Sequence, residues 1–89
     1  MKVVIADDSA LIRKQLRVLL SRIQGLVISG TAEDGVEALR QVKELNPNVL
    51  VLDIGMPRKS GIEVLKEIRR ENHATVIIMY TADLLTRLR

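Results

Sequence analysis

The sequence contains no cysteine and almost no aromatic residues. Its 89 residues include one tyrosine, Tyr80, but no phenylalanine, tryptophan or cysteine. The absence of cysteine excludes disulfide frameworks and thiolate metal sites, as is common in a reducing compartment. The scarcity of aromatic rings removes the platform on which single-stranded nucleic acids stack. Since 47% of the residues are hydrophobic, we expect an ordered core built from aliphatic side chains.

Long apolar runs and clusters of one charge are also missing. No apolar stretch approaches the roughly 20 residues that a membrane-spanning helix needs, and no signal-peptide pattern opens the sequence. The net charge is +3, from 14 Lys and Arg against 11 Asp and Glu. The basic residues are scattered along the amphipathic segments, which is typical of a solvated surface. We therefore expect one cytoplasmic domain over residues 1–89 that binds neither membranes nor nucleic acids.

The hydrophobic pattern alternates between short strand-like runs and segments with helical spacing. Most of the strand-like runs are unbroken and rich in valine and isoleucine, as in strands buried on both faces. Four strands are predicted: Lys2–Ala6, Leu26–Thr31, Val49–Asp53 and Thr75–Tyr80.

The first helix is predicted to begin after Ser9, its N-cap, and to run to about Ile23. Gly25 then suits the left-handed conformation that commonly ends a helix. One stripe of apolar side chains is expected to face the sheet. Its members are Ile12, Leu16, Leu19, Leu20 and Ile23.

The remaining helices also carry start signals. Asp34 and Ser60 are each followed three residues later by glutamate, which predicts capping boxes for the second and third helices. The second helix is expected to end before Pro47. A last helix with three leucines is predicted to begin at Thr81–Asp83.

Alternating strands and helices with short loops predict an α/β fold with a parallel sheet and right-handed crossovers. If the first helix covers one face and the second and third cover the other, the strand order is 2-1-3-4. In this order the second strand lies on one side of the first strand, and the third and fourth strands lie on its other side. The topological switch point is therefore between the first and third strands, and ligands of open α/β sheets bind at such a point.

Aspartates follow both of these strands. Lys2–Ala6 runs into Asp7 and Asp8, and Val49–Asp53 ends in Asp53. Three carboxylates brought together repel one another unless a proton or a cation intervenes. Mg²⁺ is the cation expected in an all-oxygen site of this kind, together with waters and a phosphate. A helix-capping role is the alternative for Asp7 or Asp8.

The order of these motifs resembles that of the receiver domains of two-component response regulators. The acidic pair Asp7-Asp8 follows the first strand, and Asp53 is followed by Ile54–Pro57. Gly61 stands at the start of the third helix, and Thr81 closes the fourth strand. The resemblance covers the whole chain and implies a flavodoxin-like three-layer sandwich.

The resemblance also implies a role for each residue of the acidic site. Asp53 would be the phospho-acceptor, which attacks a phosphohistidine on a histidine kinase or phosphotransfer protein. Asp7, Asp8 and Asp53 would hold Mg²⁺ together with the backbone carbonyl of Gly55. Thr81 would be the switch hydroxyl that hydrogen-bonds a phosphoryl oxygen.

The chain departs from the receiver pattern at its C-terminal side. Receivers continue with a fifth strand and helix, and that strand carries a lysine that pairs with the phosphoryl group. We therefore expect a receiver lacking the fifth βα unit and phosphorylated less readily, with Lys59 as a partial substitute. An uncovered surface that includes Leu11 and Val18 predicts a homodimer. It would form through the edge of the fourth strand, the first-helix face or exchange of the last strand and helix.

Two other functions were considered. The chain could be a non-signalling module of the receiver fold in which self-association dominates. A Mg²⁺-dependent phosphatase acting on small substrates is disfavoured, because the adjacent pair Asp7-Asp8 lacks the Asp-x-Asp spacing expected of a nucleophile and an acid. The sequence also offers no cap domain to enclose a substrate.

Overall fold

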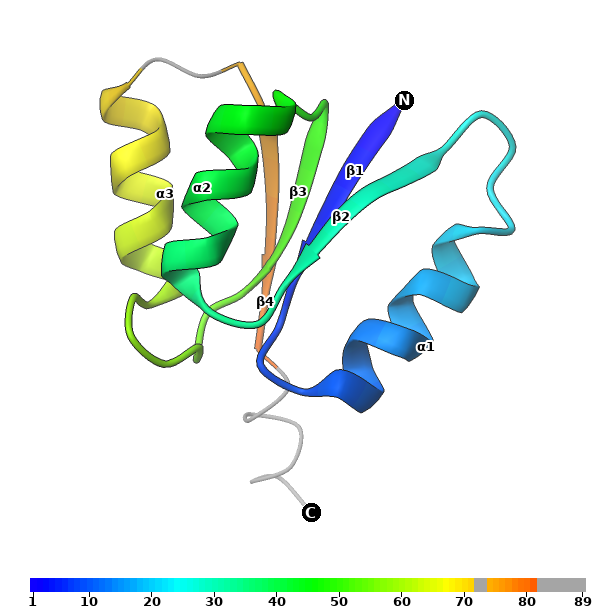
Figure 1. Cartoon of the computed structure of the whole chain (residues 1–89), viewed down its shortest axis with the longest axis horizontal. Coiled ribbons are helices and arrows are strands. Elements are labelled where there is room, and N and C mark those ends of the chain that lie inside the picture. Colours follow the sequence, from blue (N-terminus) through cyan, green and yellow to red (C-terminus); the bar gives the residue numbers. More distant parts are fainter. Residues whose placement is uncertain (72–73, 82–89) are drawn as a thin grey trace.

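The computed structural model describes residues 1–71 and 74–81. Within them the strands form one parallel sheet in the order β2-β1-β3-β4. Figure 1 shows α2 and α3 together on one face of this sheet and α1 on the other. The predicted α/β fold class, flavodoxin-like arrangement and 2-1-3-4 order are confirmed. The elements are β1 (Lys2–Ala6), α1 (Ala10–Leu20), β2 (Val27–Ala32), α2 (Gly35–Leu45), β3 (Val49–Asp53), α3 (Gly61–Arg70) and β4 (Val76–Tyr80).

The main core lies between the sheet and the helices α2 and α3. Because successive side chains of a strand point to opposite faces, every second residue of β1 and β3 enters this layer. Burying each valine, leucine or isoleucine side chain of this layer contributes about 1.5–3 kcal/mol. The central members are Val4, Ala6, Leu50 and Leu52 from the strands and Ala38, Val42, Val64 and Ile68 from the helices.

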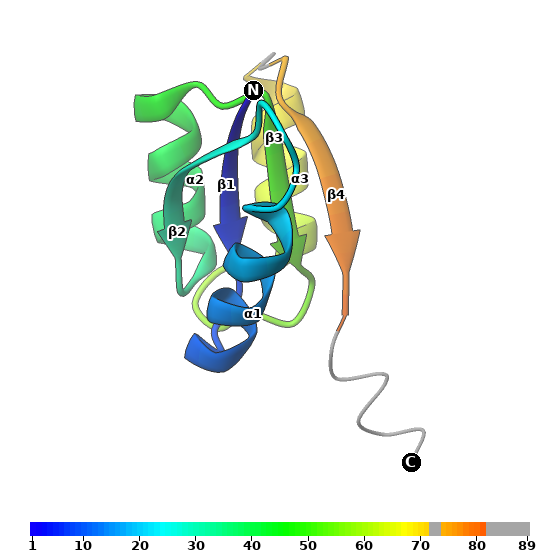
Figure 2. The same cartoon turned by 90° about the vertical axis from the view of Figure 1, so that its right-hand side faces the viewer.

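The opposite face of the sheet is only partly covered. Figure 2 shows α1 in front of the sheet, whereas β4 has no helix in front of it among the described residues. No residue of α1 is buried. Leu11 and Val18 are exposed as predicted, but Leu19, expected on the buried stripe, is 57% exposed. The stripe prediction was wrong for Leu19, because nothing described here covers that side of α1, and for Ile23, which is 50% exposed and lies beyond the end of the helix.

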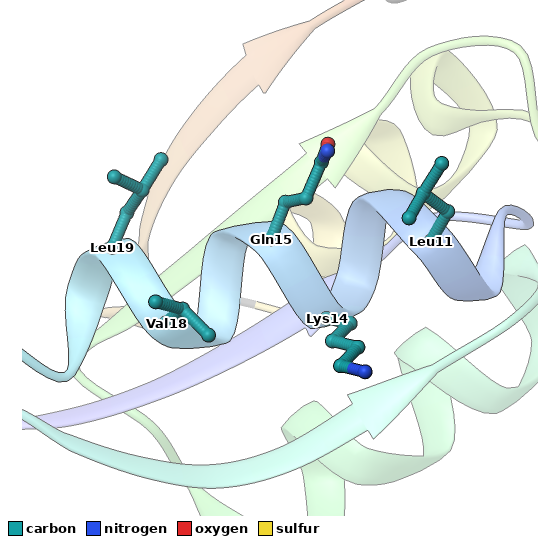
Figure 3. A pocket seen from close by; sticks show the side chains of 5 residues that line it. All are labelled: Leu11, Lys14, Gln15, Val18 and Leu19. Atoms are coloured by element: carbon teal, nitrogen blue, oxygen red, sulfur yellow. The ribbon is translucent and has the colours of Figure 1, made fainter.

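The exposed side of α1 carries an apolar hollow. It is about 470 Å³ in volume and is lined entirely by α1. Figure 3 shows its lining side chains spread along α1. They are Leu11, Lys14, Gln15, Val18 and Leu19.

The end of α1 also differs from the prediction. The helix ends at Leu20, with Ser21 as C-cap, and not near Ile23. The Ser21 hydroxyl donates to the carbonyl of Val18 at 2.7 Å, and the N–H of Ile23 reaches back only three residues, to Leu20. Such shorter bonds tighten and close a helix. Gly25 does adopt a positive φ of 83°, in the turn that follows.

The start signals of α2 and α3 are found where they were predicted. Ser60 and Glu63 form the reciprocal capping box of α3. Asp34 accepts the N–H of Glu37 at 2.8 Å, but the carboxylate of Glu37 accepts a hydrogen bond from Gln41. The capping box predicted for α2 is therefore only half formed: Asp34 accepts the N–H of Glu37, and Glu37 bonds to Gln41 instead of returning a bond.

Two further outcomes concern element bounds. β2 and β4 begin one residue later than expected, at Val27 and Val76, and β2 also ends one residue later, at Ala32. The predicted last helix starting at Thr81–Asp83 lies outside the described residues, apart from Thr81 itself. Over residues 1–71 and 74–81, none of the helices has both the length and the apolar character that crossing a bilayer demands.

Candidate functional site

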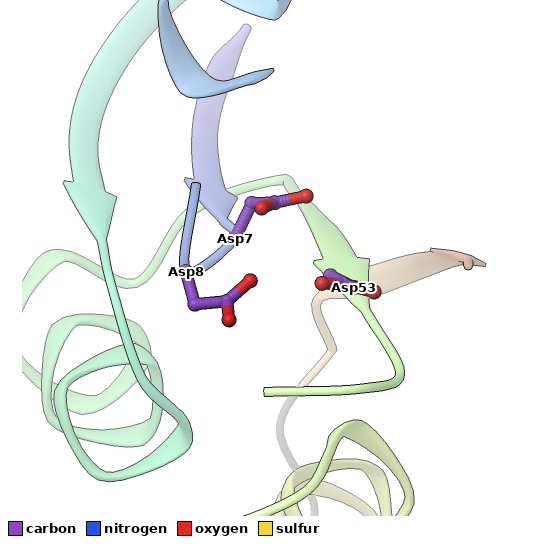
Figure 4. A group of neighbouring side chains, drawn as sticks. All are labelled: Asp7, Asp8 and Asp53. Atoms are coloured by element: carbon purple, nitrogen blue, oxygen red, sulfur yellow. The ribbon is translucent and has the colours of Figure 1, made fainter. Parts of the chain in front are cut away.

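The three predicted aspartates come together at the carboxyl ends of β1 and β3. These strands pair in parallel, with Ala6 opposite Leu52, so the residues that follow them share one edge of the sheet. One oxygen from each of Asp7, Asp8 and Asp53 lies within 4.8 Å of the others. Figure 4 shows the three side chains gathered at this edge. Asp7 and Asp53 are 1% and 6% exposed, whereas Asp8 is open to solvent.

The start of α1 holds Asp7 in place. Its Oδ1 accepts the backbone N–H of Ser9 at 2.8 Å, and its backbone carbonyl accepts a hydrogen bond from Arg13 Nη1 at 2.7 Å. Ser9 in turn caps α1 by accepting the N–H of Ile12 at 3.3 Å. The capping role that competed with metal binding in the sequence therefore belongs to Ser9, which leaves the carboxylate of Asp8 at the cluster.

The loop after β3 turns tightly around Asp53. The N–H of Gly55 donates to Asp53 Oδ1 at 3.2 Å, and Gly61 returns its N–H to the carbonyl of Ile54 at 3.0 Å. A Cβ on Gly61 would stand 2.7 Å from the carbonyl oxygen of Asp53, so glycine permits this close approach. Gly61 thus helps to fix the position of the loop that carries the Asp53 carboxylate.

The two basic residues of this loop point to other partners. Lys59 Nζ forms an ion pair with Glu67, and Arg58 pairs with Asp34 at 3.1 Å. The hypothesis that Lys59 pairs with a phosphoryl group at this site is therefore not favoured, because its ion pair with Glu67 would have to break first.

Tyr80 belongs to the site although the sequence analysis did not place it there. It lies opposite Asp53 in the β3–β4 register, and its hydroxyl donates to Asp7 Oδ2. Burial, this hydrogen bond and the negative charges of the cluster raise the pKa of Tyr80 well above its usual value. The phenol therefore remains a proton donor at any ordinary pH. The available signal was its position: it is the last residue of a strand next to the one that ends in Asp53.

Thr81 follows Tyr80 directly at the same edge of the sheet and is half-buried. Gly55 is exposed in the loop after Asp53. The switch role of the Thr81 hydroxyl and the metal-binding role of the Gly55 carbonyl stay predictions, although both residues lie in segments next to the cluster.

The composition of the cluster fits Mg²⁺. All its side-chain ligands are carboxylate oxygens, which hard cations prefer, and the spread of 4.8 Å suits one ion that also keeps several waters. The exposed side chain of Asp8 leaves the site open to solvent on one flank.

Comparison with known proteins places this geometry in a family. The model of the response regulator receiver domain matches residues 3–86. A protein-glutamate methylesterase/protein-glutamine glutaminase of Saccharophagus degradans is 46% identical over 80 residues, which are 90% of this chain and 23% of that protein. The transcriptional regulatory protein YdfI of Bacillus subtilis is 36% identical over 80 residues, 90% of this chain and 38% of that protein. The chain thus spans less than half the length of these relatives.

Solved structures of response regulator proteins are also similar to this chain. The response regulator domain of Thermotoga maritima CheB has a TM-score of 0.84 and 34% identity, and the similarity covers 100% of this chain and 71% of that one. The CheX–CheY complex with BeF₃ and Mg²⁺ from Borrelia burgdorferi gives a TM-score of 0.84 and 36% identity over 92% of this chain and 62% of that one. The family model extends over residues 3–86, and the two solved structures share the fold on which the acidic edge of this chain (Asp7, Asp8 and Asp53) is built. This chain therefore belongs to the response regulator receiver domains of two-component systems.

Proposed function

We propose that the chain is a Mg²⁺-dependent phospho-acceptor and that Asp53 receives the phosphoryl group. The partner would be a histidine kinase or a phosphotransfer protein. The observation that carries this proposal is the convergence of Asp7, Asp8 and Asp53 at one edge of the sheet. The relative solved as a CheX–CheY complex with BeF₃ and Mg²⁺ supports it by similarity.

The proposed reaction is a nucleophilic displacement at phosphorus. A carboxylate oxygen of Asp53 forms a bond to the phosphorus atom, while the bond from phosphorus to the donor histidine nitrogen breaks and its electron pair stays on the imidazole. Bound Mg²⁺ would offset the charge of the transferring oxygens. Asp7, Asp8 and the Gly55 carbonyl would complete its protein ligands with Asp53, and the Thr81 hydroxyl would hydrogen-bond a phosphoryl oxygen.

The test is phosphoryl uptake from the small donor acetyl phosphate, followed by intact mass. We expect the wild-type protein to gain one phosphoryl group in Mg²⁺ and none when the metal is chelated, because the repulsion between the cluster and the donor then goes uncompensated. No uptake by a folded protein that binds Mg²⁺ would contradict the proposal and would favour the non-signalling alternative.

A second function, self-association, rests on a separate observation. Leu11 and Val18 on α1 and Val76 and Ile78 on β4 are exposed, and β4 forms an edge of the described sheet. Exposed apolar strands at a sheet edge favour pairing with another chain. We infer that a second copy covers this surface in a homodimer, through the β4 edge, the α1 face or exchange of the last segments.

Sedimentation of two matched variants tests this dimer. Replacing Ile78 with glutamate places a charge in the apolar surface and is expected to convert a dimer at micromolar concentration into a monomer. The control Ile62→Glu makes the same change at an exposed position of α3, on the other face, and is expected to leave the dimer intact. A wild-type protein that sediments as a compact monomer would rule the dimer out.

A further inference from the structure

Tyr80 connects β4 to both halves of the acidic site. Its hydroxyl donates to Oδ2 of Asp7, and its backbone carbonyl accepts the N–H of Ile54 at 2.9 Å, the residue after Asp53. A single residue of β4 therefore contacts the carboxylate that follows β1 and the loop that follows β3. Thr81 is its immediate neighbour in the chain.

The hydrogen bonds of Asp7 make this contact important for metal binding. Its carboxylate is buried, and each oxygen already accepts one hydrogen bond: Oδ1 from the N–H of Ser9 and Oδ2 from Tyr80. The first bond belongs to the start of α1, whose backbone is fixed. The second comes from a side chain that can rotate away, and a hydrogen bond to an ionised acceptor is stronger than one between neutral groups.

A bound cation and the Tyr80 hydroxyl would each reduce the repulsion between the carboxylates of the cluster. Both place positive charge against the carboxylates of Asp7, Asp8 and Asp53, which repel one another. When the hydroxyl donates to Oδ2, it lowers the electron density that this oxygen offers to a metal. A cation held at Oδ2 would bring its positive charge close to the phenolic hydrogen and repel it. The two interactions therefore weaken each other.

We propose that Tyr80 is a positioning residue whose hydroxyl competes with Mg²⁺ for Asp7. It stabilises the metal-free cluster, lowers the affinity for the cation and is released from Asp7 when the cation binds. The inference deepens the proposed function, since it rests on Mg²⁺ binding at this cluster. It assigns to this chain a metal-sensitive contact between the acidic edge and β4.

The composition of the chain supplies the measurement. Tyr80 is the only aromatic residue, so the intrinsic fluorescence of the protein reports on this side chain alone. We expect Mg²⁺ to change the tyrosine emission along the same saturation curve that calorimetry records for binding. The variant Tyr80→Phe, which lacks only the hydroxyl, is expected to bind Mg²⁺ about tenfold more tightly, equivalent to about 1.4 kcal/mol.

A control at the residue just before β4 separates competition from a general loss of stability. Thr75 donates its hydroxyl to the carbonyl of Pro47. It precedes the amino end of β4, whereas the cluster lies at the carboxyl ends of the strands. The variant Thr75→Val also loses one buried hydroxyl hydrogen bond and is expected to lower stability without changing the affinity for Mg²⁺. Circular dichroism confirms that each variant is folded before its affinity is compared.

The outcomes distinguish this inference from the proposed function. Wild-type protein that binds Mg²⁺ without a change in emission, or Tyr80→Phe that binds no more tightly, overturns the competition and leaves the metal site standing. Binding by Tyr80→Phe alone supports the competition in its strongest form. If neither protein binds Mg²⁺, both the competition and the Mg²⁺-dependent function fail.

Discussion

Replacing Asp53 with asparagine is expected to reduce phosphoryl uptake from acetyl phosphate to below detection, with the fold retained. The amide has nearly the shape of the carboxylate, but its nitrogen and oxygen are poor nucleophiles, so the bond to phosphorus does not form. The change also removes one of three negative charges that lie within 4.8 Å of each other. We therefore expect no loss of stability in the absence of metal, and intact mass and thermal unfolding measure the two effects.

A matched control for this variant is Asp34→Asn. Asp34 is also nearly buried, at 8% exposure, and its carboxylate caps α2 and pairs with Arg58. Asparagine caps helices about as well as aspartate, so this variant is expected to fold and to take up the phosphoryl group normally. Normal labelling of Asp53→Asn would show that another residue is the acceptor.

The acidic edge could be predicted from the sequence because it depends on chain order alone. Once Lys2–Ala6 and Val49–Asp53 are identified as parallel neighbours, the residues after them must meet, whatever the side-chain packing. The capping residues Ser9 and Ser60 were equally local signals, since each acts on an N–H three residues later.

The contact of Tyr80 with Asp7 and the exposure of α1 could not be predicted, because both depend on parts of the chain distant in sequence. The Tyr80–Asp7 hydrogen bond joins residues 73 positions apart and requires the exact register between β3 and β4. The exposure of Leu19 depends on what covers α1, and the periodicity of α1 itself carries no information about that. Sequence periodicity therefore identified the helix but not the extent of its buried surface.

The partner of Lys59 could not be predicted from the sequence either, although it lies only eight residues away. Its place in the loop after Asp53 suggested a cation near the phosphoryl group, yet its side chain pairs with Glu67 on α3. Its neighbour Arg58 adopts a positive φ of 68°, a conformation that the sequence does not signal for arginine. The loop geometry thus directs Arg58 to Asp34, the N-cap of α2, and Lys59 to Glu67 on α3.

Replacing Gly61 with alanine is expected to destabilise the protein by about 1–3 kcal/mol and to weaken both Mg²⁺ binding and phosphoryl uptake. In an open helix the same change would be favourable by about 0.5–1 kcal/mol, so the sign depends on the surroundings. Here the new Cβ would stand 2.7 Å from the carbonyl oxygen of Asp53 and 2.8 Å from Cα of Ile54. Both are backbone atoms, so the loop that follows β3 must itself move.

Urea unfolding followed by circular dichroism measures the stability of this variant, and a Mg²⁺ titration measures its site. The control is Gly25→Ala, where no atom lies within 4 Å of the added Cβ. Its cost comes only from the positive φ of 83°, about 1–2 kcal/mol, far from the acidic edge. We therefore expect Gly25→Ala to lose stability but to keep its affinity for Mg²⁺. If Gly61→Ala likewise kept full affinity and uptake, the close approach of α3 to Asp53 would not be what positions the acceptor.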